Sequence, residues 1–204
     1  MPNWCSNNLV LTHEDPAMIQ RAYDALERGE FLEEFIPVPQ QLKIVAGRVS
    51  DEDEQAKLEA DTKRNLEELG YGNWYDYCVG EWGTKWDVGQ QGASDIHPDG
   101  KMLHTFFDSA WSPPINAYEK LMAMGFGVEA MYHEGGMCYA GVWSEGVDDY
   151  VDLSELGADD IERDYPELDE CFGISESMRE YEAENEEELT AWIREGKDKL
   201  GLVS

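Results

Sequence analysis

The order of strand-like and helix-like segments between residues 4 and 143 is the feature that most constrains the fold. Strands that are buried on one side alternate apolar and polar side chains with a period of two. This alternation, or a short run rich in aromatic and β-branched residues, predicts five strands. They are residues 4–13, a segment that starts near residue 84, and residues 103–110, 128–133 and 138–143. Gly135 and Gly136 lie between the last two strands and predict a hairpin turn.

Two helices are expected between these strands. Asp15 and Pro16 form a typical N-cap and first-turn pair, and Gly29 ends the amphipathic run that follows them. Ser112 and Pro113 repeat the same start for a helix that ends at Gly125. With an insertion set aside, the order is strand, helix, strand, strand, helix, strand, which is the pattern of a ferredoxin-like antiparallel sheet with helices on one face and one added edge strand.

The insertion spans about residues 31–83 and is expected to be helical. Residues 51–69 combine strong helix formers with few large apolar side chains, so they predict an exposed, weakly anchored helix. Residues 73–82 predict a short aromatic helix that ends at Gly83. The sequence therefore predicts an α+β fold, with a ferredoxin-like core over residues 1–145 that contains this helical insertion.

Charge separates the C-terminal region from the core. The chain has 45 acidic and 15 basic side chains, a net charge of −30, and residues 145–204 hold 21 of the acidic and 5 of the basic ones. Residues 146–204 are therefore expected to form an acidic, mostly helical extension. Within it, residues 177–195 predict an amphipathic helix that packs on the core through an aromatic and aliphatic stripe made of Tyr181, Leu189, Trp192 and Ile193.

The same charge limits the possible partners. An acidic chain is repelled by nucleic-acid phosphates and by anionic lipids, so direct binding to nucleic acid or to a membrane is not expected, and a basic protein is the natural partner. No apolar run approaches the roughly 20 residues that cross a bilayer, and residues 1–5 do not resemble a secretory signal. We expect a cytoplasmic protein with reduced cysteines, and no motif of the sequence sets its oligomeric state.

Aromatic side chains are the first candidates for a binding site. Most tryptophans of the core region are expected to pack the sheet against its helices, because large aromatic side chains gain most from burial; these are Trp74, Trp82, Trp86, Trp111 and Trp143. The alternative concerns the short aromatic helix, from which Trp74, Tyr75 and Tyr77 cannot all point inward. One or two of these three rings would then anchor a ligand or a protein.

Histidines provide the candidate for an enzyme. His104 and His133 are expected on adjacent strands, and Asp108 lies on the same strand face as His104, so an acid–base or metal site from these three residues is geometrically possible. Their spacing matches no known motif, and no nucleophile motif or phosphate-binding loop accompanies them. We therefore expect no catalytic residue, no metal and no cofactor.

Four short motifs resemble those of one protein family. They are Met1-Pro2-Asn3-Trp4-Cys5-Ser6-Asn7-Asn8, Gly72-Asn73-Trp74-Tyr75-Asp76-Tyr77-Cys78, Trp82-Gly83-Thr84-Lys85-Trp86-Asp87 and Ala110-Trp111-Ser112-Pro113-Pro114. Together, and in this order over residues 1–143, they resemble the YubB-like family of phage and conjugative-plasmid proteins. The resemblance implies a ferredoxin-like domain in an accessory protein of a mobile element, acting inside a bacterial host cell. It implies no activity and no catalytic residue.

The function predicted from these features is that of a non-enzymatic inhibitor. Its acidic surface would imitate nucleic-acid phosphates and occupy the basic cleft of a DNA- or RNA-binding host protein, such as a defence enzyme. The expected partner-binding residues are the carboxylates Glu180, Glu184, Glu187, Glu188, Asp148, Asp149, Asp159 and Asp160 and the aromatic residues Trp74, Tyr75 and Tyr77. The alternatives are a small-ligand or metal-dependent enzyme on the sheet, and an acidic structural or assembly protein.

Overall fold

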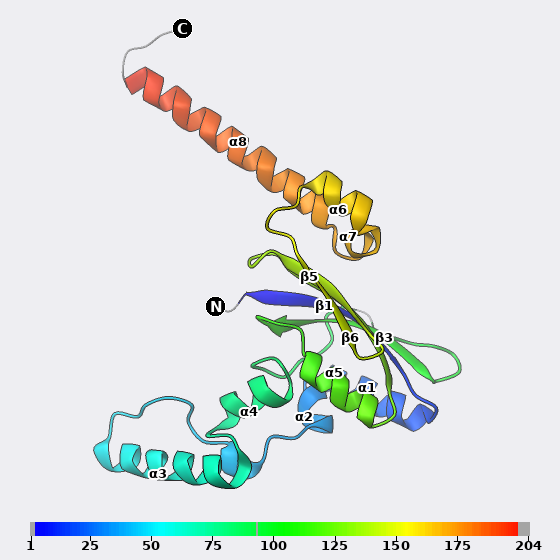
Figure 1. The fold of residues 1–204 in the computed structure, drawn as a ribbon, viewed down its shortest axis with the longest axis vertical. Coiled ribbons are helices and arrows are strands. Elements are labelled where there is room, and N and C mark those ends of the chain that lie inside the picture. Colours follow the sequence, from blue (N-terminus) through cyan, green and yellow to red (C-terminus); the bar gives the residue numbers. More distant parts are fainter. Residues whose placement is uncertain (1–2, 93, 200–204) are drawn as a thin grey trace. The chain divides into compact units, whose positions relative to one another are not determined.

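The computed structural model describes residues 3–92 and 94–199 (Figure 1). The chain divides into two compact units, Met1–Val151 and Asp152–Ser204. None of the described helices is both long enough and apolar enough to cross a membrane.

The first unit is built on an antiparallel sheet whose described strands follow the order β2-β3-β1-β4-β5-β6. The strand at the centre, β1, pairs with β3 on one side and with β4 on the other, so that Asn7 faces Phe107 and Tyr132. The strands are β1 (Trp4–Thr12), β2 (Asp95–Ile96), β3 (Met102–Ala110), β4 (Gly127–Glu134), β5 (Tyr139–Ser144) and β6 (Val147–Asp152). With its helices, the chain is therefore an α+β protein.

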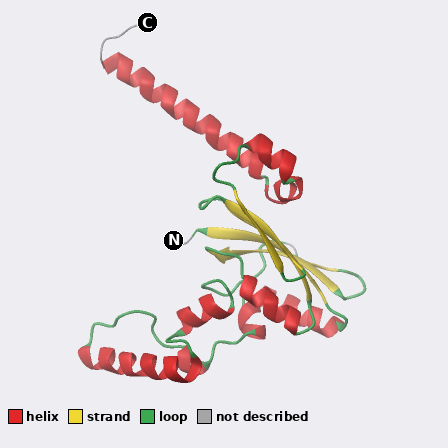
Figure 2. Ribbon diagram, in the orientation of Figure 1, coloured by secondary structure: helices red, strands yellow, loops and turns green. Residues whose placement is uncertain are grey.

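Alternation along the central strands creates one buried face. Cys5, Asn7, Leu9 and Leu11 of β1 are buried, whereas the residues that alternate with them are partly exposed. Helices α1 (Pro16–Arg28) and α5 (Ile115–Ala123) lie on the buried side of the sheet (Figure 2). Their buried side chains complete the core, among them Ile19, Ala22, Leu26, Tyr118 and Leu121.

The insertion after α1 is helical, as predicted. It contains α2 (Phe31–Phe35), a short 3-10 helix η1 (Gln40–Leu42), α3 (Glu52–Leu69) and α4 (Trp74–Glu81). Asp51 caps the start of α3 through the amides of Asp53 and Glu54, and Gly70 ends it in the left-handed conformation. Asn65 is the buried residue of this helix, which confirms the prediction of an exposed helix.

Two predicted element boundaries in this unit are wrong. Residues 83–94 hold no strand among those the structure describes, because the Thr84 hydroxyl donates to the Ala110 carbonyl at 3.0 Å and ties this segment to the end of β3. Helix α5 begins at Ile115 rather than at Pro113. The Ser112 hydroxyl donates to the Gly83 carbonyl at 2.6 Å, so it does not cap a helix.

The predicted start of the helical extension also needs correction. Residues 147–152 form β6, which pairs beside β5 in the sheet. The turn between the two strands has left-handed backbone angles at both Glu145 (φ 51°) and Gly146 (φ 82°). Two such residues form the tight hairpin turn that matches strand twist, so the chain returns along the sheet before it leaves the first unit.

The second unit is helical. It contains α6 (Ala158–Asp164), α7 (Pro166–Phe172) and α8 (Ile174–Lys199). Ile161, Leu168 and Ile174 are buried, and the Arg179 guanidinium of α8 forms ion pairs with Asp159 and Glu162 of α6. The first turns of α8 are thereby fixed to α6.

The predicted packing stripe on α8 is not buried. Tyr181 is 68% exposed and Trp192 is 72% exposed. The side chains of Leu189 and Ile193, the other two members of that stripe, lie outside the described residues. The helical period places Tyr181 and Trp192 on one side of α8, as predicted. The two rings are therefore exposed side chains of α8 in the second unit.

Candidate functional site

Three exposed tryptophans lie together on the surface of the first unit. Trp4 is 49% exposed, Trp86 is 37% exposed and Trp111 is 43% exposed. The ring centroids of Trp4 and Trp86 are 5.9 Å apart, and those of Trp86 and Trp111 are 6.5 Å apart with planes inclined by only 23°. We call these three residues the tryptophan cluster. Exposed aromatic rings in contact with one another are typical of binding surfaces.

Hydrogen bonds join the segments that carry this cluster. The amide of Trp111 donates to the Asn3 carbonyl at 3.0 Å, which fixes the end of β3 to the start of β1. The bonds of Thr84 to Ala110 and of Ser112 to Gly83, described above, tie residues 83–84 to the same place. Segments far apart in the sequence thus converge here, and three of the four motifs named above supply them.

A lysine ammonium lies against the rings. The Nζ atom of Lys85 is 4.6 Å from the Trp86 ring centroid, 5.1 Å from that of Trp111 and 5.6 Å from that of Tyr75. A cation within about 6 Å of a ring centroid is attracted by the ring quadrupole. Lys85 therefore links the cluster to Tyr75 on α4.

The backbone of Trp111 is strained. Its φ is 67°, in the left-handed region that a bulky side chain rarely adopts. Such a conformation persists where the surroundings enforce it, and it is common at functional sites. Two hydrogen bonds hold Trp111 in place. Its backbone N–H donates to the Asn3 carbonyl, and its carbonyl accepts from the Tyr139 hydroxyl at 2.6 Å. In this conformation the indole ring is exposed.

A hollow of about 470 Å³ adjoins Trp111. Its aromatic walls are Trp111, Tyr132, Tyr139 and Tyr150, and its carboxylate is Asp148. Val79, Gly83, Ser112, Pro113, Ile115 and Asn116 complete the lining. We call this the Trp111 hollow. The Tyr132 hydroxyl donates to Asp148 Oδ1 at 2.6 Å, and burial together with this bond raises the pKa of Tyr132, so the phenol stays a donor.

Glycine at position 141 makes that hydrogen bond possible. Gly141 of β5 pairs directly with Tyr132 of β4, and Asp148 lies on β6 beyond it. A Cβ at residue 141 would overlap the Tyr132 hydroxyl and would lie 2.9 Å from the Asp149 carbonyl oxygen. The tyrosine ring can cross β5 only because this side chain is missing.

The predicted aromatic anchors on α4 have different environments. Trp74 and Tyr77 pack partly buried against the core, and the Tyr77 hydroxyl donates to the Pro37 carbonyl at 3.1 Å. Tyr75 is half-buried beside Lys85. Of the three, Tyr75 is the one that borders the tryptophan cluster.

The expected core role of the tryptophans holds for two of them and fails for two others. Trp82 and Trp143 are buried, whereas Trp86 and Trp111 are exposed. The segments that carry the exposed pair contain Gly83 and the Pro113-Pro114 dipeptide, which prevent a regular element that would turn the rings inward. These irregular segments are the sequence signal for a surface site. Lys85 lies in one of them, so the same signal could have indicated it.

The predicted acidic residues have different surroundings within each unit. Glu180, Glu184, Glu187 and Glu188 are all exposed on α8. Asp159 is paired with Arg179, and Asp160 is paired with Arg163 at 2.8 Å and accepts from the Gly157 amide. Asp148 belongs to the Trp111 hollow, and Asp149 is exposed beside it on β6. The four glutamates of α8 are thus the predicted carboxylates that lie together on one exposed helix.

Two residues of the histidine alternative are hydrogen-bonded to other side chains. The Nε2 atom of His104 is bonded to Asn8 Oδ1 at 2.6 Å, and Asp108 accepts from the Ser6 hydroxyl at 3.0 Å. Burial lowers the pKa of His133. Among the described residues, no group of three or more histidine, cysteine, aspartate or glutamate side chains is placed to hold a metal ion.

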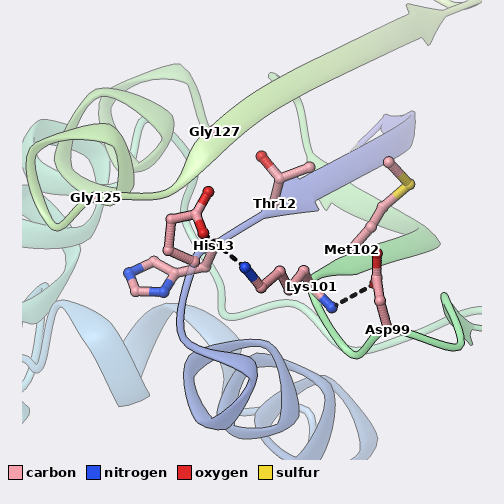
Figure 3. Close-up of a pocket in the computed structure, with 8 residues that line it drawn as sticks. Thr12, His13, Asp99, Lys101, Met102, Gly125 and Gly127 are labelled. Carbon is pink, nitrogen blue, oxygen red and sulfur yellow. Dashed lines mark hydrogen bonds and ion pairs between the residues drawn. The ribbon is translucent and has the colours of Figure 1, made fainter.

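A second hollow, of about 250 Å³, has an ion pair among the residues that line it (Figure 3). Its lining includes Thr12, His13, Gly125 and Gly127. The Lys101 ammonium donates to Glu14 Oε2 at 2.7 Å, and the Lys101 amide donates to Asp99. Since the cation already has a carboxylate partner, we assign no ligand to this hollow.

Comparison with known proteins gives one structural likeness. No family model matches this chain, and no curated protein does. The crystal structure of the protein api92 from Yersinia pseudotuberculosis, described as a DUF1281 protein, is similar at a TM-score of 0.42 and 13% sequence identity. The match covers 74% of this chain and 98% of that chain. A likeness at this level carries no argument about function.

Proposed function

We propose that this chain is a non-enzymatic binding protein whose acidic helix α8 occupies the basic, nucleic-acid-binding cleft of another protein. The single observation that carries the proposal is the exposure of Glu180, Glu184, Glu187 and Glu188 on one side of that helix. With a rise of about 1.5 Å per residue, the four carboxylates are distributed over about 12 Å, or one per about 4 Å. Phosphates along one strand of duplex DNA repeat every 3.4 Å or so.

Exposed aromatic rings support this role for α8. Tyr181 and Trp192 border the glutamate stripe on the helix surface and are both exposed. Charge accelerates encounter with a basic partner but adds little affinity when it stays at the rim. Tyrosine and tryptophan are the side chains that most often contribute large binding energies. A helix that carries both can be drawn to a basic cleft and then retained by it.

The proposal also covers the fold of the core and the place where the protein acts. The order β2-β3-β1-β4, with α1 and α5 as the two connecting helices, supports a ferredoxin-like core to which β5 and β6 are added. Convergence of the resembling motifs around the tryptophan cluster supports a relation to the YubB-like proteins. We accordingly place the protein in the cytoplasm of a bacterial host, as an accessory protein of a phage or plasmid.

Competition with duplex DNA tests the proposed function. Immobilised protein is incubated with the heparin-binding fraction of a bacterial lysate, and the retained proteins are challenged with duplex DNA at constant salt. We expect retention of nucleic-acid-binding proteins that duplex DNA releases, because both ligands would occupy the same basic cleft. Retained proteins that resist DNA but leave at high salt would show general charge attraction and would contradict the proposal.

A further inference from the structure

The Trp111 hollow combines aromatic rings with one carboxylate. Tyr139 and Tyr150 are stacked, with ring centroids 5.4 Å apart and planes inclined by 30°, and Tyr150 is 57% exposed. Asp148 lines the same hollow. Its volume of about 470 Å³ lies within the range of natural ligand sites. The hollow is therefore large enough for a side chain or a small ligand to enter.

We propose that the Trp111 hollow binds the guanidinium group of an arginine side chain that a basic partner protein presents. This inference rests on the proposed function, because it assumes that the partner is basic, and it adds a second contact remote in sequence from α8. The chemistry is that of a cation held between aromatic faces and a carboxylate. An anionic ligand would have to approach a chain whose net charge is −30.

Geometry favours arginine over lysine as the occupant. A guanidinium is planar, so it stacks on an aromatic ring and at the same time donates two parallel hydrogen bonds to a carboxylate. The stacked tyrosines Tyr139 and Tyr150 offer the rings, and Asp148 offers the carboxylate. Lys85 already lies against Trp111, so the incoming cation uses the tyrosines rather than the indole ring.

The groups that would bind the guanidinium are held in place by hydrogen bonds within the protein. Tyr132 orients Asp148 through its hydroxyl, and Tyr139 is fixed by its bond to the Trp111 carbonyl. Groups that are already ordered lose less conformational entropy when they bind. Burial raises the pKa of Tyr139, so its hydroxyl keeps the proton that it donates.

A titration with short peptides tests this site on the full chain. The probe is the blocked tripeptide acetyl-Gly-Arg-Gly-amide, followed by the indole N–H signal of Trp111 and the amide signals of β6 in NMR spectra. A matched peptide with citrulline keeps the shape and most hydrogen-bond donors of arginine but carries no charge. We expect saturable shifts with the arginine peptide and none at these signals with the citrulline peptide.

Two neighbouring aspartates provide the matched variants. Asp148→Asn should weaken binding of the arginine peptide by about fivefold, because it removes the carboxylate that lines the hollow. Asp149→Asn removes the same charge from the next residue of β6, whose side chain points to the opposite face, and should leave the affinity within about twofold. Tyr132→Phe, which keeps the ring and deletes the hydroxyl bond to Asp148, should also weaken binding.

Three results would overturn the site: equal binding of the citrulline peptide, equal weakening by the two aspartate variants, or no saturable shift at Trp111 and β6. None of them bears on α8, because the DNA competition depends on glutamates of the second unit. Failure of that competition together with specific arginine binding would instead contradict the proposed function and retain the hollow as a cation site. The two claims can therefore fail independently.

Discussion

Tyr132 reaches across strand β5 and donates its hydroxyl to Asp148 Oδ1 of β6 at 2.6 Å. The strand between them contributes Gly141, which has no side chain to block the ring. One absent side chain therefore sets the shape of the Trp111 hollow and the position of its carboxylate.

Replacing that glycine should remove the hollow. We expect Gly141→Ala to destabilise the protein by about 1–3 kcal/mol, because the new methyl group overlaps the Tyr132 hydroxyl and must displace the ring. Urea unfolding measures the loss. The control is Gly135→Ala, where a Cβ would meet only ordinary contacts with the His133 ring at 3.5 Å and 3.8 Å. Equal stability of the two variants would show that the ring does not depend on the missing side chain.

Strain at Trp111 predicts that the glycine variant at this position is more stable than the alanine variant, the reverse of the usual order. At most positions alanine is more stable than glycine, because glycine gives the unfolded chain more freedom. At φ 67° we expect Trp111→Gly to be more stable than Trp111→Ala by about 1 kcal/mol, since only glycine adopts the left-handed conformation without cost. Urea unfolding of both variants gives the difference. If the alanine variant is the more stable, this backbone is not strained.

Trp192 should matter for binding and not for folding. Because the ring is 72% exposed, Trp192→Ala should change the free energy of unfolding by no more than about 0.5 kcal/mol. The Trp192→Ala variant should bind a protein captured in the DNA competition more weakly, because an exposed tryptophan is a typical anchor residue of a binding surface. A loss of stability well above 1 kcal/mol would revive the buried stripe that the sequence suggested.

Local signals in the sequence predict local structure well in this chain. Asp15 and Gly29 delimit α1, and Asp51 and Gly70 delimit α3, because helix caps act within a few residues. The irregular segment after Gly83 was missed because hydrogen bonds to Ala110 and from Ser112, both far along the chain, decide its path. Such partners leave no periodic pattern in the sequence.

The candidate site was only partly predictable for a related reason. Hydrophobicity favours burial of every tryptophan, so nothing in composition separates buried Trp82 and Trp143 from exposed Trp86 and Trp111. The carboxylates of α8 were predictable because a charged helix face follows from the helical period alone. Asp159 and Asp160 were not distinguishable from them, since Arg179 and Arg163 become their partners only in the folded second unit.

Acid should destabilise the first unit through His133. Burial lowers the pKa of this imidazole below its usual 6.5, so the unfolded chain binds the proton more readily than the folded one. Its contribution to stability is therefore full above about pH 6.5 and is lost as the pH falls through the lower, folded-state pKa. His133→Gln should flatten the decline of the free energy of unfolding between about pH 7 and pH 5. The exposed His97→Gln is the control, and identical slopes in wild type and the His133 variant would contradict the assignment.

The salt dependence of partner binding tests the central claim most directly. In the test variant Glu180, Glu184, Glu187 and Glu188 become glutamine, and in the control Glu54, Glu59, Glu67 and Glu68 on exposed α3 do, so both variants have the same net charge. Affinity for one protein that duplex DNA releases is measured over a range of salt concentrations. We expect weaker binding and a shallower salt slope for the α8 variant, with the α3 variant close to wild type. Equal effects in the two variants would show that total charge, and not the carboxylates of α8, governs binding, and would contradict the account.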